Sequence, residues 1–272
     1  METGDTHRLQ LILHYDGSLF HGWQYQPDHR TVQGDLQTAL QRLTGEPRTV
    51  VGSGRTDTGV HATGQVAIVD LPVRWTPEEL ERALNAVLPR DIWVESVRST
   101  RRDFHPRHQA VARSYEYRVG TEPQACSPFA RRSCWALAEP LDRDRLDRAA
   151  ALLPGDHSFR AFAKSGQPHR GYRAIVESAG WSEWELGLRI RITANRYLHH
   201  MVRYLVGTMV AIGRHQRPLE DMAALMAGAP DMTTSPPAPP EGLFLTEVEY
   251  PDLTETDRRS PTTTERSKAP AS

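Results

Sequence analysis

Hydrophobic and polar residues follow each other along the first hundred positions in a pattern that predicts six secondary-structure elements. Residues 8–15 are apolar with scattered polar positions, which is typical of a strand. Thr31 can cap a helix, because apolar residues then recur every three or four positions up to residue 43. Thr76, Pro77 and Glu79 form a helix start with a capping box. Further strands at 49–53, 65–71 and 92–97 complete the order β-α-β-β-α-β, as in a ferredoxin-like unit.

The second half of the chain repeats this pattern more loosely. Its predicted elements are a strand at 111–119, a helix at 142–153, a hairpin across 181–184, a helix at 198–212 and a strand at 243–250. Short connections favour one continuous sheet with helices on one face, so we expect an α+β protein. We place an N-terminal subdomain at 1–105 and a C-terminal one at 106–251. Residues 252–272 have almost no apolar side chains and are expected to be a disordered tail.

Composition narrows the class of protein only modestly. The 272 residues are 38% hydrophobic and 25% charged, which is ordinary for a water-soluble protein. No apolar run approaches the roughly 20 residues of a membrane span, and the polar N-terminus has no signal-peptide core. The two cysteines, Cys126 and Cys134, suggest neither a disulfide framework nor a metal site of their own. We therefore expect a cytoplasmic protein without a membrane partner.

Charge is distributed unevenly, although the net charge is only −1. Residues 98–118 hold six arginines, and residues 186–218 hold six more without a single acid. Residues 160–173 add three arginines and Lys164. Because phosphate binding needs a local positive field rather than a positive total, these stretches favour a nucleic-acid partner. The arginines that we expect to contact phosphates are Arg107, Arg170 and Arg214.

Residues 52–67, which read GSGRTDTGVHATGQVA, carry the strongest chemical signal in the chain. Four glycines surround Arg55 and Asp57, and glycine permits sharp turns and close approach of a ligand. A carboxylate beside a guanidinium suits chemistry on a polyanionic substrate. Taken alone, Asp57 in a glycine-rich loop could equally be part of a turn between two strands.

This stretch resembles the signature loop of the tRNA pseudouridine synthases of the TruA type, and the likeness extends in order from about residue 8 to 251. The opening YDGS at Tyr15 and GWQ at Gly22 resemble the family's first strand and turn. Residues 103–107 and 112–117 resemble its central segment, and HHMVR at 199–203 resembles its C-terminal helix. Ser53 and Thr58 stand where family members often carry alanine.

The resemblance implies a fold and an activity. The fold would be the pseudouridine synthase fold, in which two ferredoxin-like subdomains form a continuous, largely antiparallel sheet flanked by helices, with a central cleft. The activity would be isomerisation of uridine to pseudouridine at positions 38, 39 and 40 in the anticodon arm of tRNA, by a homodimer. No cofactor is expected, since the chain also lacks a phosphate-binding loop of the Walker or Rossmann type.

The resemblance also assigns residues to roles. Asp57 would be the nucleophile, and Arg203 would pair with it and hold it ionised. Tyr115 would lie over the target uracil, with the apolar Leu243 against the tyrosine. Arg55 would enter the RNA stack in place of the extruded base.

Two further expectations come from spacing. Tyr115 and Tyr117 are two residues apart and so share a face of a strand, where we expect Tyr117 to be a core residue. His199 and His200 are adjacent, and on a helix they would point about 100° apart and could not chelate one metal ion. We therefore expect no metal site.

Other functions fit parts of this pattern. Ferredoxin-like units with basic strands also form RNA-recognition modules, so a non-catalytic RNA-binding protein is one alternative. Such modules stack bases on a characteristic exposed aromatic motif, which is missing here. A uridine methyltransferase would need a cofactor loop that we do not find. A pseudouridine synthase that acts on another tRNA site is the remaining alternative.

Overall fold

The computed structural model describes residues 5–164 and 171–251. The predicted tail at 252–272 and the candidate Arg170 lie outside the described residues. The helices are α1 (Val32–Thr44), α2 (Pro77–Val87), α3 (Arg143–Ala150), α4 (Met201–Gly213) and α5 (Glu220–Met226). The strands are β1 (Thr6–Tyr15), β2 (Val51–Gly52), β3 (His61–Pro72), β4 (Ile92–Thr100), β5 (Ala112–Gly120), β6 (Trp135–Ala136), β7 (Gly155–Ser158), β8 (Arg173–Trp184), β9 (Gly187–Ala194) and β10 (Leu243–Glu249).

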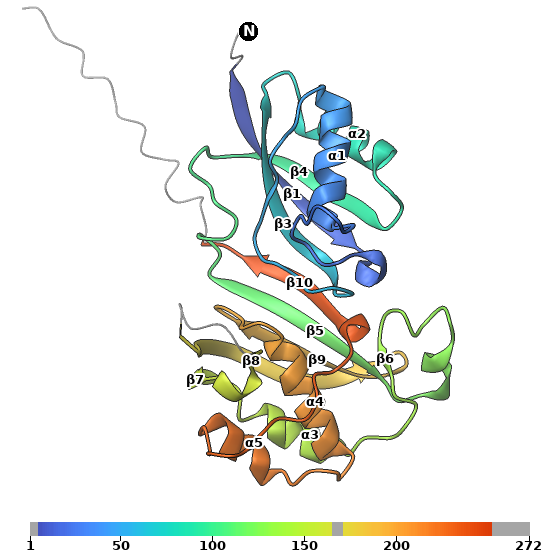
Figure 1. Cartoon of the computed structure of the whole chain (residues 1–272), viewed down its shortest axis with the longest axis vertical. Coiled ribbons are helices and arrows are strands. Elements are labelled where there is room, and N and C mark those ends of the chain that lie inside the picture. Colours follow the sequence, from blue (N-terminus) through green and yellow to red (C-terminus); the bar gives the residue numbers. More distant parts are fainter. Residues whose placement is uncertain (1–4, 165–170, 252–272) are drawn as a thin grey trace, which may run out of the picture.

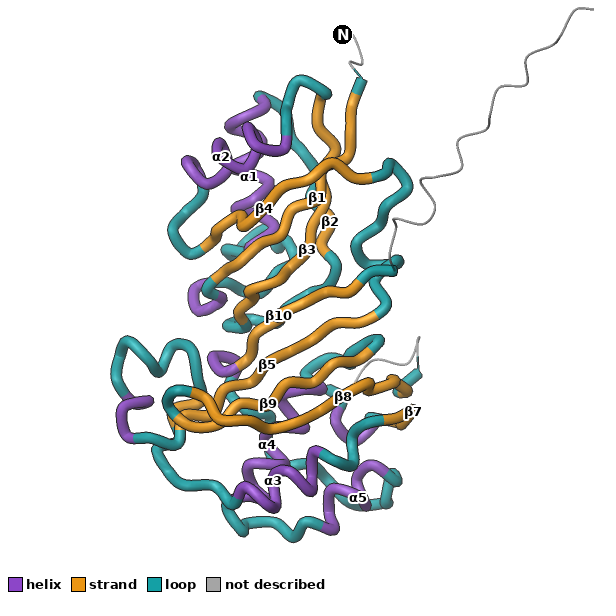
Figure 2. Tube along the Cα trace, turned by 180° about the vertical axis from the view of Figure 1, so that it is seen from behind, coloured by secondary structure: helices purple, strands orange, loops and turns teal. Residues whose placement is uncertain are grey.

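All ten strands belong to one mixed sheet, which confirms the predicted α+β class with a continuous sheet. The order along the sheet is β4-β1-β3-β10-β5-β9-β8-β7, with β2 beside β3 and β6 beside β5. Figure 1 shows the long sheet running from the N-terminal half at the top to the C-terminal half below. From behind, in Figure 2, the strands lie in front of the helices, so the helices cover one face.

The last strand joins the two halves. β10 pairs in parallel with β3 through Phe244 and His61, and antiparallel with β5 through Leu243 and Tyr117. A side chain at Gly64 would place its Cβ 2.1 Å from the carbonyl oxygen of Thr246, so only glycine permits this approach of β3 to β10. Strand β10 is thereby placed at the centre of the sheet (Figure 1).

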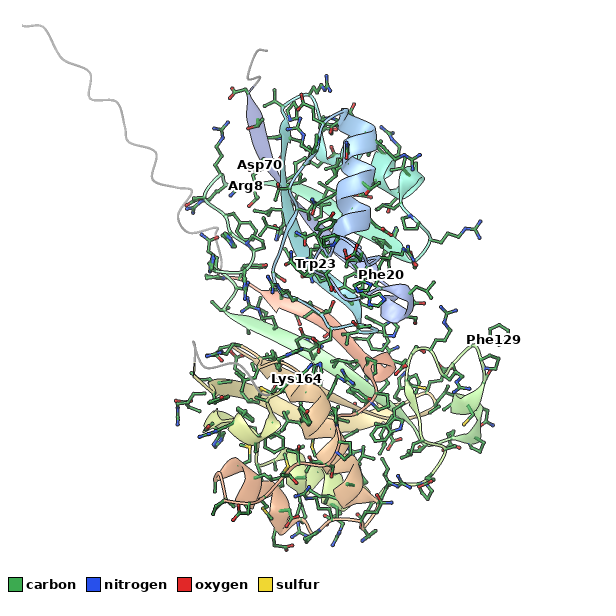
Figure 3. The ribbon with its side chains drawn as sticks, in the orientation of Figure 1. Arg8, Phe20, Trp23, Asp70, Phe129 and Lys164 are labelled. Carbon is green, nitrogen blue, oxygen red and sulfur yellow. The ribbon has the colours of Figure 1, made fainter. Side chains whose placement is uncertain are left out.

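Two hydrophobic cores lie on either side of this seam. The N-terminal core is built from β1, β3, β4, α1 and α2, and it includes the buried Phe20 and Trp23, which Figure 3 labels. The C-terminal core is built from β5, β8, β9, α3, α4 and α5. Tyr115 packs against both cores, so its position on β5 marks the boundary between them.

Helix ends are where local sequence predicted structure best. Thr31 accepts a hydrogen bond from the Gly34 amide and caps α1, and Thr76 and Glu79 form the expected capping box at α2. Asp142 caps α3, which ends at Ala150, three residues earlier than predicted. The helix predicted from residue 198 is present as α4, but it begins three residues later, at Met201. Strands β6 and β7 and helix α5 were not predicted. No helix in the described ranges is both long and apolar enough to span a membrane.

Candidate active site

A cavity of about 800 Å³ opens between the two halves of the sheet. Its walls come from the loop at 53–57, from β5, from the segment that precedes α4 and from β10. The residues from the sequence analysis that line it are Arg55, Asp57, Arg107, Tyr115 and Leu243. Segments far apart in the chain therefore meet in one place, and five candidate residues share one cavity.

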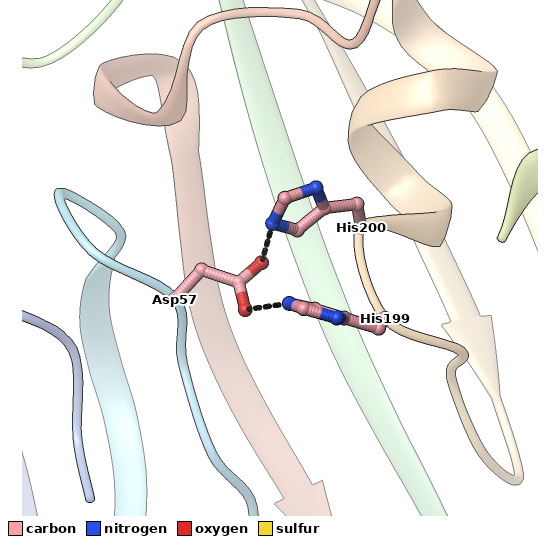
Figure 4. Close-up of side chains that lie close together, drawn as sticks. All are labelled: Asp57, His199 and His200. Carbon is pink, nitrogen blue, oxygen red and sulfur yellow. Dashed lines mark ion pairs between the residues drawn. The ribbon is translucent and has the colours of Figure 1, made fainter. Parts of the chain in front are cut away.

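Asp57 faces two imidazoles across this cavity. Its carboxylate oxygens lie 3.4 Å from His199 Nε2 and 3.5 Å from His200 Nε2 (Figure 4). The side chain of Asp57 is only 27% exposed. The carboxylate is therefore partly shielded from solvent and lies between two ring nitrogens.

The two histidines converge because they precede the helix rather than belong to it. His200 has a φ of 64°, in the left-handed region, and it is the N-cap of α4. Helical spacing therefore does not apply, and the prediction that the two rings point about 100° apart is wrong. A non-glycine residue in this region costs energy and is maintained by surrounding structure, often at functional sites. The carbonyl of His199 accepts a hydrogen bond from the Lys164 amide, which fixes this turn from the other side.

These three side chains form a possible set of metal ligands. One carboxylate oxygen and two imidazole nitrogens lie within 4.8 Å of one another. This donor set is one that divalent transition metals accept, so the residues could hold such an ion. The geometric argument against a shared metal ion therefore does not hold.

Tyr115 forms part of the cavity wall, on a strand that lies between β10 and β9. It lies opposite Leu245 on β10 and Ile192 on β9, and its ring meets that of Tyr197 edge to face at 4.8 Å. Burial raises the pKa of the Tyr115 hydroxyl well above its usual value, and the charges of Tyr15 and Asp57 raise it further. The hydroxyl therefore stays protonated near neutral pH.

Tyr117 is the core residue that its spacing predicted. Its side chain is fully buried, and its hydroxyl donates a 2.7 Å hydrogen bond to the carbonyl of Pro239. Leu243 lies opposite Tyr117, whereas Leu245 lies opposite Tyr115. Both leucines line the cavity, and sequence reasoning missed Leu245. The period-2 spacing of the two leucines in β10 was the signal that could have found it.

Comparison with known proteins identifies the family of this chain. The family model described as tRNA pseudouridine synthase matches residues 11–109 and 149–251. The chain belongs to this family.

The relatives are similar over almost the whole described chain. The tRNA pseudouridine synthase A of Moorella thermoacetica is 41% identical over 244 residues, which are 89% of this chain and 99% of the relative. The enzyme of the same name from Syntrophomonas wolfei is 36% identical, over 90% of this chain and 98% of its own. That of Geobacillus kaustophilus is 39% identical, over 91% and 96%.

Arg203 departs from the pairing that the family resemblance implied. Its Nε donates a 2.7 Å hydrogen bond to the carbonyl of Ala238, and within the described ranges it forms no ion pair with Asp57. Arg203 lies in the first turn of α4, whereas His199 precedes the helix. The guanidinium still lies near enough for its charge to act on His200 and Tyr117. The pairing prediction is corrected: His199 and His200, not Arg203, contact the carboxylate.

The remaining arginines divide between the cavity and another surface. Arg113, which sequence reasoning did not single out, also lines the cavity, and burial lowers its pKa. Its guanidinium donates hydrogen bonds to the carbonyls of Ser53 and Arg107, so it ties the 53–57 loop to the central segment. Arg214 lies elsewhere, in a second cavity that Pro236, Pro237 and Pro239 also line. It forms a 2.7 Å ion pair with Glu139.

Proposed function

We propose that this chain isomerises uridine to pseudouridine in tRNA, at positions 38, 39 and 40 of the anticodon arm, with Asp57 as the nucleophile. The observation that carries the proposal is the placement of Asp57 between two imidazoles, inside a cavity walled by Tyr115 and two leucines. Family membership supports the reaction class. The site supplies what the reaction needs, which is a carboxylate, an aromatic platform and shelter from water.

The reaction breaks the bond from uracil N1 to ribose C1′ and forms a bond from C5 to C1′. The C5 proton leaves and a proton is taken up at N1, so the exchange is redox-neutral. A flipped uridine would lie on Tyr115 and Leu245, with Asp57 directed at the reacting carbons. The imidazoles of His199 and His200 fix the rotamer of that carboxylate before substrate arrives.

The roles of the arginines follow from where their side chains lie. Arg55 projects at the rim of the cavity, one residue from Gly54 and two from Asp57, and it would fill the gap that the extruded base leaves. Arg107 would contact a phosphate near the same rim. Arg203, close to the site without touching Asp57, would act on the bound uridine or its phosphate. Arg170 and Arg214 would contact RNA further from the reacting base.

The wider assignment rests on the family resemblance. We propose a cytoplasmic enzyme that works as a homodimer on the anticodon arm, with no cofactor consumed. A non-catalytic RNA-binding protein is the competing function. The clustered arginines would support it if the protein bound tRNA without turnover. Asp57 held by two histidines argues for chemistry, because binding alone requires no such carboxylate beside a polyanion.

Pseudouridine mapping tests the proposal. Unmodified tRNA transcripts with uridines at 38, 39 or 40 are incubated with the purified protein, and pseudouridine is mapped to single positions. We expect modification at these positions and none with Asp57→Asn. Modification at other positions would place this chain at a different tRNA site. Binding of tRNA without any modification would leave the RNA-binding alternative.

A further inference from the structure

The loop that carries Asp57 alternates between anchored and projecting residues. Gly54 and Thr56 form hydrogen bonds with side chains of β3 and β1, whereas Arg55 is exposed and Asp57 faces the cavity. Arg55 and Asp57 each follow a residue that is held by hydrogen bonds. Holding residues 54 and 56 therefore restricts where the side chains of 55 and 57 point.

Gln65 provides the first set of hydrogen bonds that hold this loop. It lies on β3 and is fully buried, and its carboxamide is directed at the loop. Its Oε1 accepts a 2.7 Å hydrogen bond from Ser53 Oγ, and its Nε2 donates a 3.0 Å hydrogen bond to the carbonyl of Gly54. A buried amide must find partners for both its donor and its acceptor, and here both partners belong to the catalytic loop.

Tyr15 provides the second anchor. Its hydroxyl and Thr56 Oγ1 are 2.8 Å apart, and Gln65 Nε2 donates a longer hydrogen bond of 3.4 Å to the same hydroxyl. Burial raises the pKa of Tyr15 to about 12, so the hydroxyl stays neutral and can donate throughout the range in which the enzyme is assayed. The two anchors are thus joined into one buried network under residues 53–56.

The backbone of Gly22 and Trp23 holds the loop from another side. The Trp23 amide donates a 3.1 Å hydrogen bond to the carbonyl of Thr56. A Cβ on Gly22, whose φ is +83°, would lie 2.6 Å from that same carbonyl oxygen. Thr56 is therefore held by its side chain, its carbonyl and a close backbone neighbour, which leaves the adjacent Asp57 little freedom to move along the chain.

We propose that Gln65 and Tyr15 are positioning residues for the isomerisation, and that their buried network sets the direction in which Asp57 enters the cavity. Neither residue lines the cavity, so neither touches the substrate, and both act through Ser53, Gly54 and Thr56. This inference rests on the proposed role of Asp57 as the nucleophile. Displacement of a catalytic group by about 1 Å can cost on the order of 10²-fold in rate, so loss of the network acts on turnover.

The test compares Gln65→Met and Tyr15→Phe with the wild-type protein. Gln65→Met keeps the length of the side chain and removes both polar atoms, and Tyr15→Phe keeps the ring and removes the hydroxyl. Single-turnover rates of pseudouridine formation are measured at saturating enzyme, together with the Kd for tRNA and the unfolding midpoint. We expect rates to fall by about 10- to 100-fold while the Kd stays within about twofold, because phosphate contacts carry the affinity.

Gln33→Met is the matched control. Gln33 is also a buried glutamine whose amide bonds to backbone, but its partners are the Val50 carbonyl, the Tyr25 amide and the Gln24 side chain, all outside the catalytic loop. We expect a stability loss similar to that of Gln65→Met with an unchanged single-turnover rate. The double variant Gln65→Met/Tyr15→Phe is expected to lose less than the product of the single effects, since both residues belong to one network.

Three results would overturn the inference. The first is a wild-type rate in both folded variants, and the second is an equal rate loss in Gln33→Met. The third is a rate loss that appears only as weaker tRNA binding. If Gln65→Met does not fold, Thr56→Val keeps the branched side chain, removes the hydroxyl that bonds to Tyr15, and must lower the rate without changing the Kd. A wild-type protein that forms no pseudouridine would instead refute the proposed function.

Discussion

The carboxylate of Asp57 lies 3.5 Å from the imidazole of His200, although the two residues belong to opposite halves of the sheet. The contact depends on one backbone feature, the left-handed conformation of His200 at the start of α4. Because that conformation turns the ring back toward the cavity, the C-terminal half contributes directly to the orientation of an N-terminal carboxylate (Figure 4).

The first prediction concerns Asp57 itself. Asp57→Asn retains the size of the side chain and removes its charge, so we expect pseudouridine formation to stop while tRNA affinity stays within about threefold. Affinity survives because it comes mainly from the arginines that surround the cavity. Product formation is followed over long incubations against a control without enzyme. Pseudouridine above that control would remove Asp57 from the role of nucleophile.

The second prediction concerns His200 and pH. Burial lowers the pKa of His200, and the charges of His199, Arg203 and Lys164 lower it further, whereas the charge of Asp57 opposes them. The unfolded chain therefore takes up a proton before the folded one as the pH falls. The stability that neutral His200 contributes is present above about pH 6.5 and is lost as the pH falls through the lower folded-state value.

His200→Gln isolates this contribution, because it retains a polar group near Asp57 that does not titrate. We expect the urea midpoint of the wild-type protein to fall more steeply than that of His200→Gln as the pH is lowered below about 6.5. Other histidines with a lowered pKa, such as His105, contribute equally to both proteins and cancel in the difference. Parallel midpoint curves would show that His200 does not titrate differently in the folded protein.

The third prediction separates Tyr115 from Tyr117. The raised pKa of Tyr115 disfavours the phenolate, so we expect its ring rather than its hydroxyl to act. Tyr115→Phe is then nearly silent, and Tyr115→Ala loses about 1–3 kcal/mol of base stacking. If the hydroxyl collects a proton, Tyr115→Phe lowers turnover by roughly 10²–10⁴ instead.

Tyr117→Phe is the companion variant. It breaks the hydrogen bond to Pro239, and we expect a small loss of stability, of about 1 kcal/mol, with little change in turnover. Rates are compared at saturating tRNA, with folding checked by thermal melts. Loss of turnover in a folded Tyr117→Phe, with an active Tyr115→Ala, would contradict the assignment of the platform to Tyr115.

Local patterns in the sequence predicted most elements, because caps and periodicity depend on near neighbours. Thr31 and Thr76 each cap the helix that their position indicated. The placement of β10 between β3 and β5 depends instead on a contact between distant segments, which period-2 spacing cannot reveal. The pairing of Leu245 with Tyr115 could not be predicted for that reason, since the two residues lie far apart in the chain.

The sequence predicted several residues of the site, but it did not predict which side chains contact Asp57. The glycine-rich loop and Tyr115 were found from motif residues, and both line one cavity. The histidines were misjudged because helical periodicity was extended through residues 198–200, where the backbone is not helical. Arg203 was paired with Asp57 on the family resemblance alone, whereas its guanidinium donates to the carbonyl of Ala238.

The last prediction concerns how the RNA is held. Arg107 lines the catalytic cavity, and Arg214 lies in the second cavity with Glu139 as its ion-pair partner. If each contacts one phosphate, replacement by alanine reduces the slope of log Kd against log salt by about 1, without a change in which uridines are modified. We expect the same of Arg170. Filter binding over a range of salt concentrations gives the slopes, and Arg143→Ala is the control, since this arginine lines neither cavity. Reduced slopes for Arg107→Ala alone would confine the RNA to the catalytic cavity, and unchanged slopes for all three would show that the RNA binds elsewhere.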